Sequence, residues 1–493
     1  MQEKANEYIE QRVDKLNALK EIGIVPYGGR FNKSRSIAVL AEDYKENTHV
    51  QTAGRVTALR EHGKSSFLDL RDASGRIQAY VKSDTIGAEA YSNIFKRIDI
   101  GDILGVKGKL FKTRTGEITI NAEEITFLAK GLRPLPEKWH GLKDVEIRYR
   151  QRYVDLIVNE DVRKVFQVRS KIISKIRSFL DDKGFLEVET PMMHSLAGGA
   201  AGEPFKTHHK ALDTDLFLRL APELYLKRLL VGGFDKVYEL NRNFRNEGIS
   251  VRHNPEFTML EVYEAYSDCE GMMRLTEELF SHVAKEALGT LKIKFKDQDI
   301  DLSAPWPRWS FADEIKKKFD INPDDPAKEW IEKLKKHGMD FKGKDITRSQ
   351  IVNIISEMLE PETKDKPMFV VDLFAELCPL AKRKKDNPLL TDRFELFMGG
   401  MEVANAYSEL NDPIEQKKRF EEQLVGQEGV KRIDEDFVRA LEYGMPPAGG
   451  LGIGIDRLVM LLANQPSIRD VILFPQLKPE TRITTNQKPN YHE

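Results

Sequence analysis

The first 22 residues combine apolar and charged positions at the spacing of a helix. Most of the apolar positions lie three or four residues apart, with lysine and glutamate between them. This spacing predicts an amphipathic helix over residues 2–22, within an N-terminal helical segment of residues 1–48. The apolar positions are Tyr8, Ile9, Val13, Leu16 and Leu19.

From Val50 to about Phe127 the pattern changes to short runs that are typical of strands. Turn signals separate the runs at His62-Gly63, at residues 72–75 and at Thr115-Gly116. Several short strands at this spacing predict a small barrel, and the natural candidate is the five-stranded OB-fold, which binds nucleic acids. We place this domain at residues 49–130.

A stretch rich in proline and polar residues follows, and we interpret residues 131–147 as a linker. Residues 165–180 then carry a long apolar helical face, and Gly184 is placed to end that helix. The strand-like segment FLEVETP comes next. A helical segment rich in lysine, glutamate and aspartate interrupts the strands at about 312–365 and looks like an insertion. These elements belong to a second domain over residues 148–493.

Charged residues stand where a core strand should be apolar between Arg242 and Thr258. Because strand side chains alternate between two faces, Arg245 and Glu247 share one face. The simplest interpretation is an antiparallel hairpin with a mobile tip at residues 248–254. Arginine grips phosphate oxygens, an aromatic ring stacks on a base, and carboxylates hold an amine or a metal, which favours a binding site over a solvated hairpin. One face of the second strand presents Phe257, Met259, Glu261 and Tyr263.

A further hairpin is predicted over residues 391–413, with its turn at Gly399-Gly400. Acidic residues interrupt its apolar strands. Burying a lone carboxylate is expensive, so each of them needs a cation or a hydrogen-bond partner. Glu395 and Glu402 are the kind of carboxylate pair that holds Mg²⁺ between phosphates.

Strand parity sets a condition on this hairpin. In a regular strand Glu402 would face away from Asn405, Tyr407 and Glu409. If all four side chains face one site, a bulge or a twist has to lie between Glu402 and Asn405.

Residues 449–462 form a glycine-spaced strand that runs into an apolar helix. Glycines let a ligand approach the backbone closely. Arg457 lies near the predicted helix start, where a phosphate is favoured. The glycine spacing differs from that of a dinucleotide-binding fingerprint, and no βαβ pattern surrounds it.

Composition narrows the class of protein. A chain of 493 residues suggests about three domains. The net charge of −2 does not indicate a nucleic-acid binder, so any RNA contact has to come from local basic patches. Two cysteines, Cys269 and Cys378, exclude a four-cysteine zinc site. No apolar run is long enough to span a membrane and the N-terminus lacks a signal-peptide core, so we expect a cytoplasmic protein.

Three of these segments together resemble the class II aminoacyl-tRNA synthetases. GFLEVETP (184–191) resembles motif 1, FRNEG followed by RHNPEFT resembles motif 2, and GLGIGIDRL (450–458) resembles motif 3. The motifs occur in the family's order, and the resemblance extends over nearly the whole chain and is closest to the bacterial lysyl-tRNA synthetases. It implies an α+β fold with an N-terminal OB-fold barrel and a catalytic antiparallel sheet flanked by helices. It also implies a homodimer, built on the 165–180 helix and motif 1.

The resemblance implies a reaction in two steps. Lysine and ATP form lysyl-adenylate and pyrophosphate, and the lysyl group then passes to the 3′ end of tRNA(Lys). Arg245 and Arg457 are implied to be catalytic, and Mg²⁺ is implied at Glu395 and Glu402. The residues implied to bind ATP are Arg245, Glu247, Arg252, His253, Asn254, Phe257, Glu402 and Arg457.

The resemblance also assigns a lysine pocket and an anticodon site. The pocket contains three carboxylates and, on this reading of the sequence, no basic residue beside them, which favours an ammonium side chain. Its residues are Gly199, Glu223, Arg245, Glu261, Tyr263, Asn405, Tyr407 and Glu409. Glu223, after Ala-Pro, could instead simply begin a helix. The anticodon is implied to contact Phe67, Gln78 and Glu117, although Phe67 could equally belong to the barrel core.

Some features leave alternatives open. The loop Ala197–Glu203 departs from the family, which usually has a proline before the glycines and Ser-Ala-Arg at positions 201–203. An aspartate-type synthetase shares this architecture, but its substrate would be repelled by the acidic pocket. Paralogues that lysylate protein lack an N-terminal barrel. A catalytically idle RNA-binding protein is opposed by the intact catalytic arginines and metal-binding glutamates.

Overall fold

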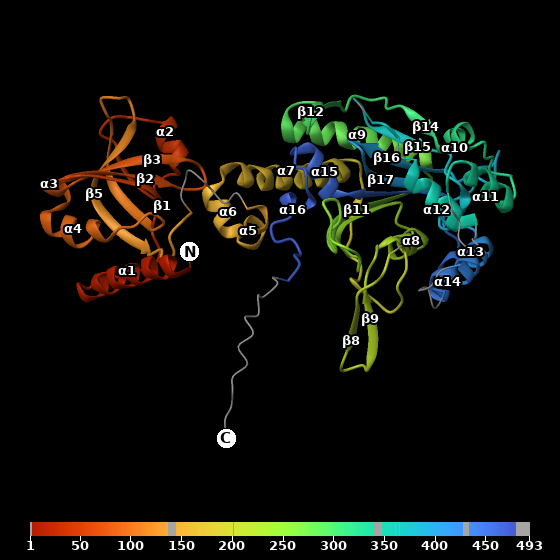
Figure 1. Ribbon diagram of the computed structural model, residues 1–493, viewed down its shortest axis with the longest axis horizontal. Coiled ribbons are helices and arrows are strands. Elements are labelled where there is room, and N and C mark those ends of the chain that lie inside the picture. The colour runs from red at the N-terminus through yellow and green to blue at the C-terminus, as the bar shows by residue number, and fades with distance from the viewer. Residues whose placement is uncertain are drawn as a thin grey trace, which may run out of the picture. The chain divides into compact units, whose positions relative to one another are not determined.

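The structure is a computed structural model, and it describes residues 2–136, 144–200, 202–339, 348–359, 361–363, 365–426 and 433–479. Three expected features lie partly outside these ranges. They are the linker at residues 137–143, the loop that differs from the family at residue 201, and the insertion at residues 340–347, 360 and 364. The chain divides into two compact units, Met1–Lys143 and Asp144–Glu493 (Figure 1).

The first unit contains the expected barrel. Its elements are α1 (Gln2–Glu21), α2 (Ile37–Glu42), β1 (His49–His62), β2 (Ser65–Arg71), β3 (Arg76–Lys82), α3 (Ser83–Ile86), α4 (Ala88–Asn93), η1 (Phe95–Arg97), β4 (Ile103–Lys112) and β5 (Ile118–Ala129). The five strands close in the order β1-β2-β3-β5-β4. Leu68, Leu70 and Val106 fill the interior, and Leu19 of α1 joins the same core. The strand alternation and the helix predicted for residues 2–22 are both confirmed.

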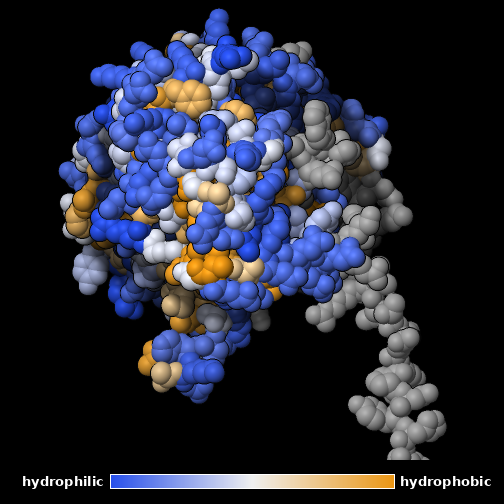
Figure 2. All heavy atoms as spheres, turned by 90° about the vertical axis from the view of Figure 1, so that its left-hand side faces the viewer, coloured by the Kyte–Doolittle hydropathy of each residue, from blue (hydrophilic) through white to orange (hydrophobic). Residues whose placement is uncertain are grey.

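The surface of this unit is polar. Figure 2 views the molecule from the side of the first unit and shows hydrophilic side chains over most of that face. Among the helices that the structure describes, none is both long enough and apolar enough to cross a membrane.

The second unit is built on one large sheet. Its elements up to the insertion are α5 (Val145–Arg150), α6 (Arg152–Val158), α7 (Glu160–Asp182), β6 (Leu186–Glu187), β7 (Met193–His194), β8 (Lys206–His209), β9 (Thr214–Leu218), α8 (Glu223–Val231), β10 (Lys236–Phe244), β11 (Glu256–Ala265), α9 (Cys269–Leu288), β12 (Lys292–Phe295), β13 (Gln298–Asp301) and β14 (Arg308–Ser310). They are followed by α10 (Phe311–Phe319), α11 (Ala327–Lys336), α12 (Arg348–Met358), β15 (Met368–Val371), η2 (Ala375–Leu377), β16 (Arg393–Met398), β17 (Met401–Ser408), α13 (Pro413–Gly426), α14 (Glu435–Glu442), β18 (Ala448–Gly454), α15 (Ile455–Leu462) and α16 (Ile468–Val471).

Eight strands form this sheet in the order β14-β15-β16-β17-β18-β11-β10-β6. Neighbouring strands are antiparallel except at the two edges, where β14 pairs with β15 and β6 pairs with β10 in parallel. The predicted helix at 165–180 is the central part of α7, and Gly184, with φ +79°, follows the end of that helix as expected. Helices α10, α11 and α12 lie in the segment where a helical insertion is expected, and they share a small hydrophobic core with β15 and the residues that follow it.

The two faces of the sheet are covered differently. On one face, side chains such as Leu260, Leu396 and Ile453 pack under α7, α9 and α15 in the main hydrophobic core. On the other face, a smaller apolar cluster joins α8 and α14 to the sheet through Leu226, Phe437 and other residues. Because strand side chains alternate, the polar positions of the central strands are directed to this second face.

The hairpin of β16 and β17 contains a register shift. Leu396 pairs with Ala404, but Phe397 pairs with Glu402, so Val403 is an extra residue in β17. An extra residue of this kind reverses the parity of the strand beyond it. Glu402 therefore shares a face with Asn405, which pairs with Glu395. The bulge that strand parity requires between Glu402 and Asn405 is therefore present. The predicted turn at Gly399-Gly400 has positive φ at both glycines.

A buried ion pair connects three separate segments of the second unit. Asp456 of α15 accepts hydrogen bonds from Arg169 of α7 (2.6 Å) and from the backbone N–H of Thr258 in β11 (2.7 Å). Arg169 also donates to the side-chain oxygen of Thr258 (3.1 Å). These bonds fix the start of α15 against the hairpin strand β11 and the long helix α7.

We expect Arg169→Met to destabilise the second unit by about 3–5 kcal/mol, because it leaves the Asp456 carboxylate buried without its cation. Thermal unfolding followed by calorimetry measures the change. The matched control is Lys164→Met, which removes an exposed ion pair with Asp161 on the same helix and should change stability by less than about 0.5 kcal/mol. Equal effects of the two substitutions would contradict the structural role of Arg169.

Candidate active site

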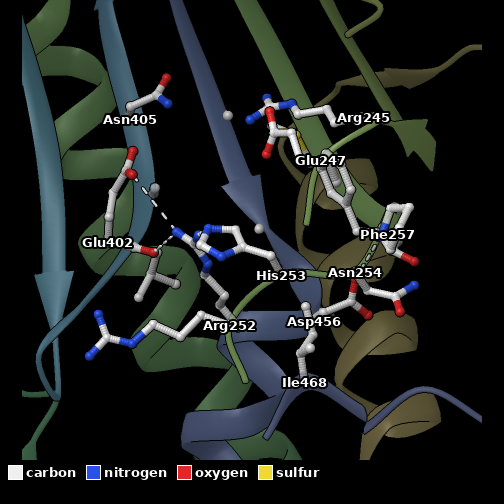
Figure 3. Close-up of a pocket in the computed structure, with 18 of the residues that line it drawn as sticks. Arg245, Glu247, Arg252, His253, Asn254, Phe257, Glu402, Asn405, Asp456 and Ile468 are labelled. Atoms are coloured by element: carbon white, nitrogen blue, oxygen red, sulfur yellow. Dashed lines mark hydrogen bonds and ion pairs between the residues drawn. The ribbon is translucent and has the colours of Figure 1, made fainter. Parts of the chain in front are cut away.

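A cavity of about 130 Å³ opens on the second face of the sheet, between the β10–β11 hairpin and the strands β17 and β18. All eight residues implied to bind ATP line it, together with Asn405, the strand glycines Gly452 and Gly454, and Asp456. Figure 3 shows Arg245, Glu247 and Phe257 on one side of this cavity, and Arg252 and Glu402 on the other. The structure therefore brings residues from motif 2, motif 3 and the second hairpin to one place.

Strand β10 ends at Phe244, so Arg245 and Glu247 follow the strand and do not lie on one face of it, as strand alternation had predicted. The backbone N–H of Arg245 donates to the carbonyl of Pro255 (2.9 Å), which closes the loop between the strands. Its guanidinium lies over the ring of Phe257, 5.2 Å from the ring centre. Burial lowers the pKa of Arg245, and its Nε is buried without a hydrogen-bond partner. An unpaired buried donor of this kind suits an anionic ligand.

Arg457, in the first turn of α15, is held by two neighbours. It donates to the carbonyl of Glu402 (2.7 Å), and its other nitrogen lies 3.1 Å from Nε2 of His253. Arginine only donates, so Nε2 of His253 accepts and its proton resides on Nδ1, where it is donated to Ser250 (2.9 Å). Burial and the nearby Arg457 lower the pKa of His253, so the ring is neutral at pH 7.

Glu395 and Glu402 form a carboxylate pair that suits a divalent cation. Burial raises the pKa of Glu395 to about 7, Arg393 opposes the rise, and Glu402 adds to it. Arg393 donates to one Glu395 oxygen (2.6 Å). No cluster of three or more metal-binding side chains occurs in the described part of the chain. Two carboxylates fit Mg²⁺, which usually takes its remaining ligands from phosphates and water.

A second, larger cavity of about 1120 Å³ adjoins the first. Arg245, Glu402 and Asn405 line both cavities, so they stand at the junction. Of the residues implied to bind lysine, Gly199, Glu223 and Tyr407 also line the larger cavity. Glu261, Tyr263 and Glu409 are buried behind this wall. Glu223 is the first residue of α8, so the alternative that it begins a helix is confirmed. It also lines the larger cavity, so the two roles do not exclude each other.

The expectation of a pocket without a basic residue is wrong. Lys227 lies one helical turn after Glu223 and is fully buried. Its ammonium is 2.7 Å from Glu223 and 2.5 Å from Glu409. The sequence already contained the signal for this pair, because residues i and i+4 of a helix are neighbours. We missed it because Glu409 approaches from a strand far along the chain.

Glu261 differs from the other two carboxylates because no cation among the residues that the structure describes is paired with it. It accepts a hydrogen bond from the Tyr263 hydroxyl (3.1 Å). Burial, with the nearby charge of Glu223, raises the pKa of Glu261 to about 8, and the tyrosine opposes the rise. A cationic ligand placed here would favour the ionised form of Glu261 and bind more tightly as the pH rises toward 8.

The residues implied to read an anticodon lie on the outer surface of the barrel. Phe67 is half-buried and directed outward, while its neighbours Ser66 and Leu68 are buried, so it does not belong to the barrel core. Its ring lies 4.9 Å from that of Tyr80. Gln78 accepts a hydrogen bond from Thr119 (3.0 Å), and Glu117 pairs with Arg76 (2.5 Å). A half-buried aromatic ring on the outer surface, beside hydrogen-bonding groups, is suited to an unpaired base.

Comparison with known protein families agrees with this geometry. Residues 144–478 match the model described as "tRNA synthetases class II (D, K and N)". Residues 50–128 match the model described as "OB-fold nucleic acid binding domain". The first match covers more than half of the chain, so the chain belongs to the class II tRNA synthetases.

Curated relatives narrow the family. A lysine–tRNA ligase of Pelotomaculum thermopropionicum is 56% identical over 488 residues, which is 97% of this chain and 96% of the relative. One of Carboxydothermus hydrogenoformans is 55% identical, covering 96% of this chain and 98% of the relative. One of Staphylococcus haemolyticus is 48% identical, covering 97% of this chain and 100% of the relative. Within its class, the chain belongs to the lysine–tRNA ligase family.

We expect Gly450→Ala to close the inner end of the larger cavity. A Cβ at Gly450 would lie 1.9 Å from Glu409 Oε1 and 2.7 Å from the ring of Tyr263. Amino-acid-dependent ATP–pyrophosphate exchange should fall by about 100-fold or more, since small displacements at a reacting site cost this much. The control is Gly452→Ala, whose Cβ would meet the flexible methyl of Met259 at 3.3 Å and should have a smaller effect on the KM for the amino acid. Equal losses would contradict this account.

Proposed function

We propose that this chain activates lysine with ATP and transfers it to the 3′ end of tRNA(Lys) for protein synthesis. The observation that carries the proposal is the place of Arg245, whose side chain lines both the smaller cavity and the larger one. A cation at this junction would meet the carboxylate of an amino acid on one side and the α-phosphate of ATP on the other. These are the two groups that have to react.

The first step needs alignment rather than a protein nucleophile. A carboxylate oxygen of lysine attacks the α-phosphorus, the bond to the β-phosphate breaks, and pyrophosphate leaves. Arg245 would hold both reacting groups, which makes the reaction effectively unimolecular and offsets the charge that develops on the α-phosphate. Arg252, His253 and Arg457 would hold the β- and γ-phosphates at the other end of the smaller cavity.

The remaining residues of the smaller cavity would orient the nucleotide. Phe257 offers an aromatic face for adenine, and Glu247 and Asn254 offer polar groups beside it. Glu395 and Glu402 would hold Mg²⁺, which supplies charge neutralisation of the phosphates when bound. These role assignments rest on the family motifs and on the shared lining of the cavities.

The charge of the larger cavity supports lysine as the substrate. Glu223, Glu261 and Glu409 outnumber Lys227, the buried cation that is paired with two of them, so the inner end of the cavity is acidic. An aspartate side chain would meet like charge there, which opposes the aspartate-type alternative.

We propose two further properties. The outer face of the barrel would bind the anticodon of tRNA(Lys), with the 49–130 domain as the RNA-binding part of a cytoplasmic enzyme. The chain would act as a homodimer through α7 and β6, where Leu186 leaves an exposed apolar side chain at the sheet edge. Light scattering of the purified chain at micromolar concentration tests the dimer, and a monomer would contradict it.

ATP–pyrophosphate exchange with single amino acids, in the presence of Mg²⁺ and without tRNA, tests the proposed activity. Exchange with lysine alone is expected. Exchange with aspartate would overturn the pocket assignment, and no exchange with any amino acid in folded protein would favour the idle RNA-binding alternative.

Arg245→Ala should lower lysine-dependent exchange by at least about 100-fold, which is the usual effect of removing one such electrostatic group. The loss should appear mainly in kcat. The matched control is Arg242→Ala on the same hairpin, because Arg242 is partly exposed, is 3.7 Å from Glu256 and lines neither cavity. Near-normal exchange in Arg245→Ala would remove this residue from the reaction.

Phe67→Ala should raise the KM for tRNA(Lys) by about 10-fold or more in aminoacylation, since a base stacked on an aromatic ring is worth ~1–3 kcal/mol. Lysine-dependent pyrophosphate exchange should stay unchanged, because it does not involve the anticodon. Phe67→Trp keeps an aromatic face and should largely retain tRNA binding. An unchanged KM for tRNA in Phe67→Ala would contradict the anticodon site.

A further inference from the structure

Asp69 is a carboxylate that is buried on the outer face of the barrel. It follows Phe67 by two residues in β2, so the two side chains share the outward face of that strand. It also pairs across the sheet with Gln78 of β3. Two arginine side chains cover the carboxylate, because Arg60 donates to one oxygen (2.8 Å) and Arg76 donates to the other (3.0 Å). The side chain of Asp69 is therefore only 6% exposed, although its position in the strand faces outward.

Arg76 contacts a second carboxylate as well. Its Nη1 donates to Asp69, and its Nη2 donates to Oε1 of Glu117 (2.5 Å). The guanidinium thus connects β2 to the residue that directly precedes β5. Because the donors of a guanidinium point in fixed directions, its contact with Asp69 also fixes the nitrogen that Glu117 meets.

The backbone of Glu117 is held by the turn between β4 and β5. Its N–H donates to the side-chain oxygen of Thr113 (3.0 Å), and its carbonyl accepts from the N–H of the same threonine (3.0 Å). Among the residues that the structure describes, Arg76 is the one that forms an ion pair with the Glu117 carboxylate. The turn therefore fixes where Glu117 begins, and Arg76 fixes where its carboxylate points.

Gln78 and Glu117 then offer opposite hydrogen-bonding groups. The side-chain oxygen of Gln78 accepts from Thr119 (3.0 Å), so its amide nitrogen is left to donate. Oε1 of Glu117 is held by Arg76, so Oε2 is left to accept. The ring of Phe67 lies on the same outer face. A donor and an acceptor beside an aromatic ring suit one unpaired base, which is stacked on the ring and read along its edge.

We propose that Arg76 is a positioning residue for base recognition, which bridges Asp69 and Glu117 and so directs the free oxygen of Glu117 toward the edge of an unpaired nucleobase. The inference rests on the anticodon site proposed above and adds to it the residue that orients its acceptor. An exposed ion pair contributes little to stability, and Asp69 keeps Arg60 when Arg76 is replaced. The loss of Arg76 should therefore appear in recognition rather than in folding.

The test measures kcat/KM for aminoacylation by the full chain, with tRNA(Lys) and with variants of it in which one anticodon base is replaced. Glu117→Ala should reduce discrimination at one anticodon position by about 10-fold or more, which is the usual effect of losing a hydrogen bond to a charged group. Arg76→Met should reduce discrimination at the same position. The double variant should lose no more than Glu117→Ala alone, because both changes remove one interaction. A general disturbance of the barrel would instead lower kcat/KM for all the tRNAs alike.

The matched control is Arg60→Met, which removes the other cation of Asp69 and leaves the ion pair between Arg76 and Glu117 in place. It should keep wild-type discrimination at every anticodon position. Arg76→Gln is a second neutral replacement if Arg76→Met does not fold, and thermal unfolding shows which variants are folded.

The outcomes separate this inference from the proposals beneath it. Wild-type discrimination in folded Arg76→Met would overturn the inference. Losses that add in the double variant would also overturn it, because Arg76 would then act without Glu117. Unchanged discrimination in Glu117→Ala would instead reject the anticodon site, and absence of aminoacylation of tRNA(Lys) by wild-type protein would reject the proposed function itself.

Discussion

The need to compensate buried carboxylates organises the second unit. An ionised carboxylate cannot be moved out of water without a cation or several hydrogen bonds. Glu239 is paired with Arg219, Asp456 with Arg169, Glu395 with Arg393, and both Glu223 and Glu409 with Lys227. Glu261 stands apart, because it accepts a hydrogen bond from a tyrosine hydroxyl and has no paired cation in the described part of the chain. The pairs hold the sheet and its helices together, and the unpaired carboxylate is left for a ligand.

Room for a ligand comes from backbone features rather than from the side chains that would bind it. The extra residue Val403 brings Glu402 to the same face as Asn405. The absence of a side chain at Gly450 leaves space for Glu409 and Tyr263. Gly202, which lies close to the side chains of Arg245 and Glu247, has φ +146°, a conformation that other residues rarely adopt. Together these features let charged groups converge on a sheet whose opposite face is an ordinary apolar core.

The same physical rule places the candidate binding groups in both units. In the barrel, apolar residues fill the interior and leave Phe67 and Tyr80 outside, where an aromatic pair can meet an unpaired base. In the second unit, the cavities lie on the face of the sheet opposite the main core. In both units the alternation of strand side chains separates the groups that stabilise the fold from those that face a ligand.

Much of this organisation follows from the sequence alone. Alternating strands predicted the barrel, helical spacing predicted α1 and α7, and the motif residues of the smaller cavity were all recognised, because these signals lie within single segments of the chain. Tertiary structure decided what depends on segments that are distant in sequence. Parity required a bulge, but only strand pairing located it at Val403. In the sequence Lys227 is an ordinary helix residue, and only the fold shows that Glu409 contacts it. Phe67 could be assigned to the outer surface only from its burial in the folded barrel. Charge compensation and burial arise from three-dimensional neighbours, and a linear pattern does not specify which neighbours those are.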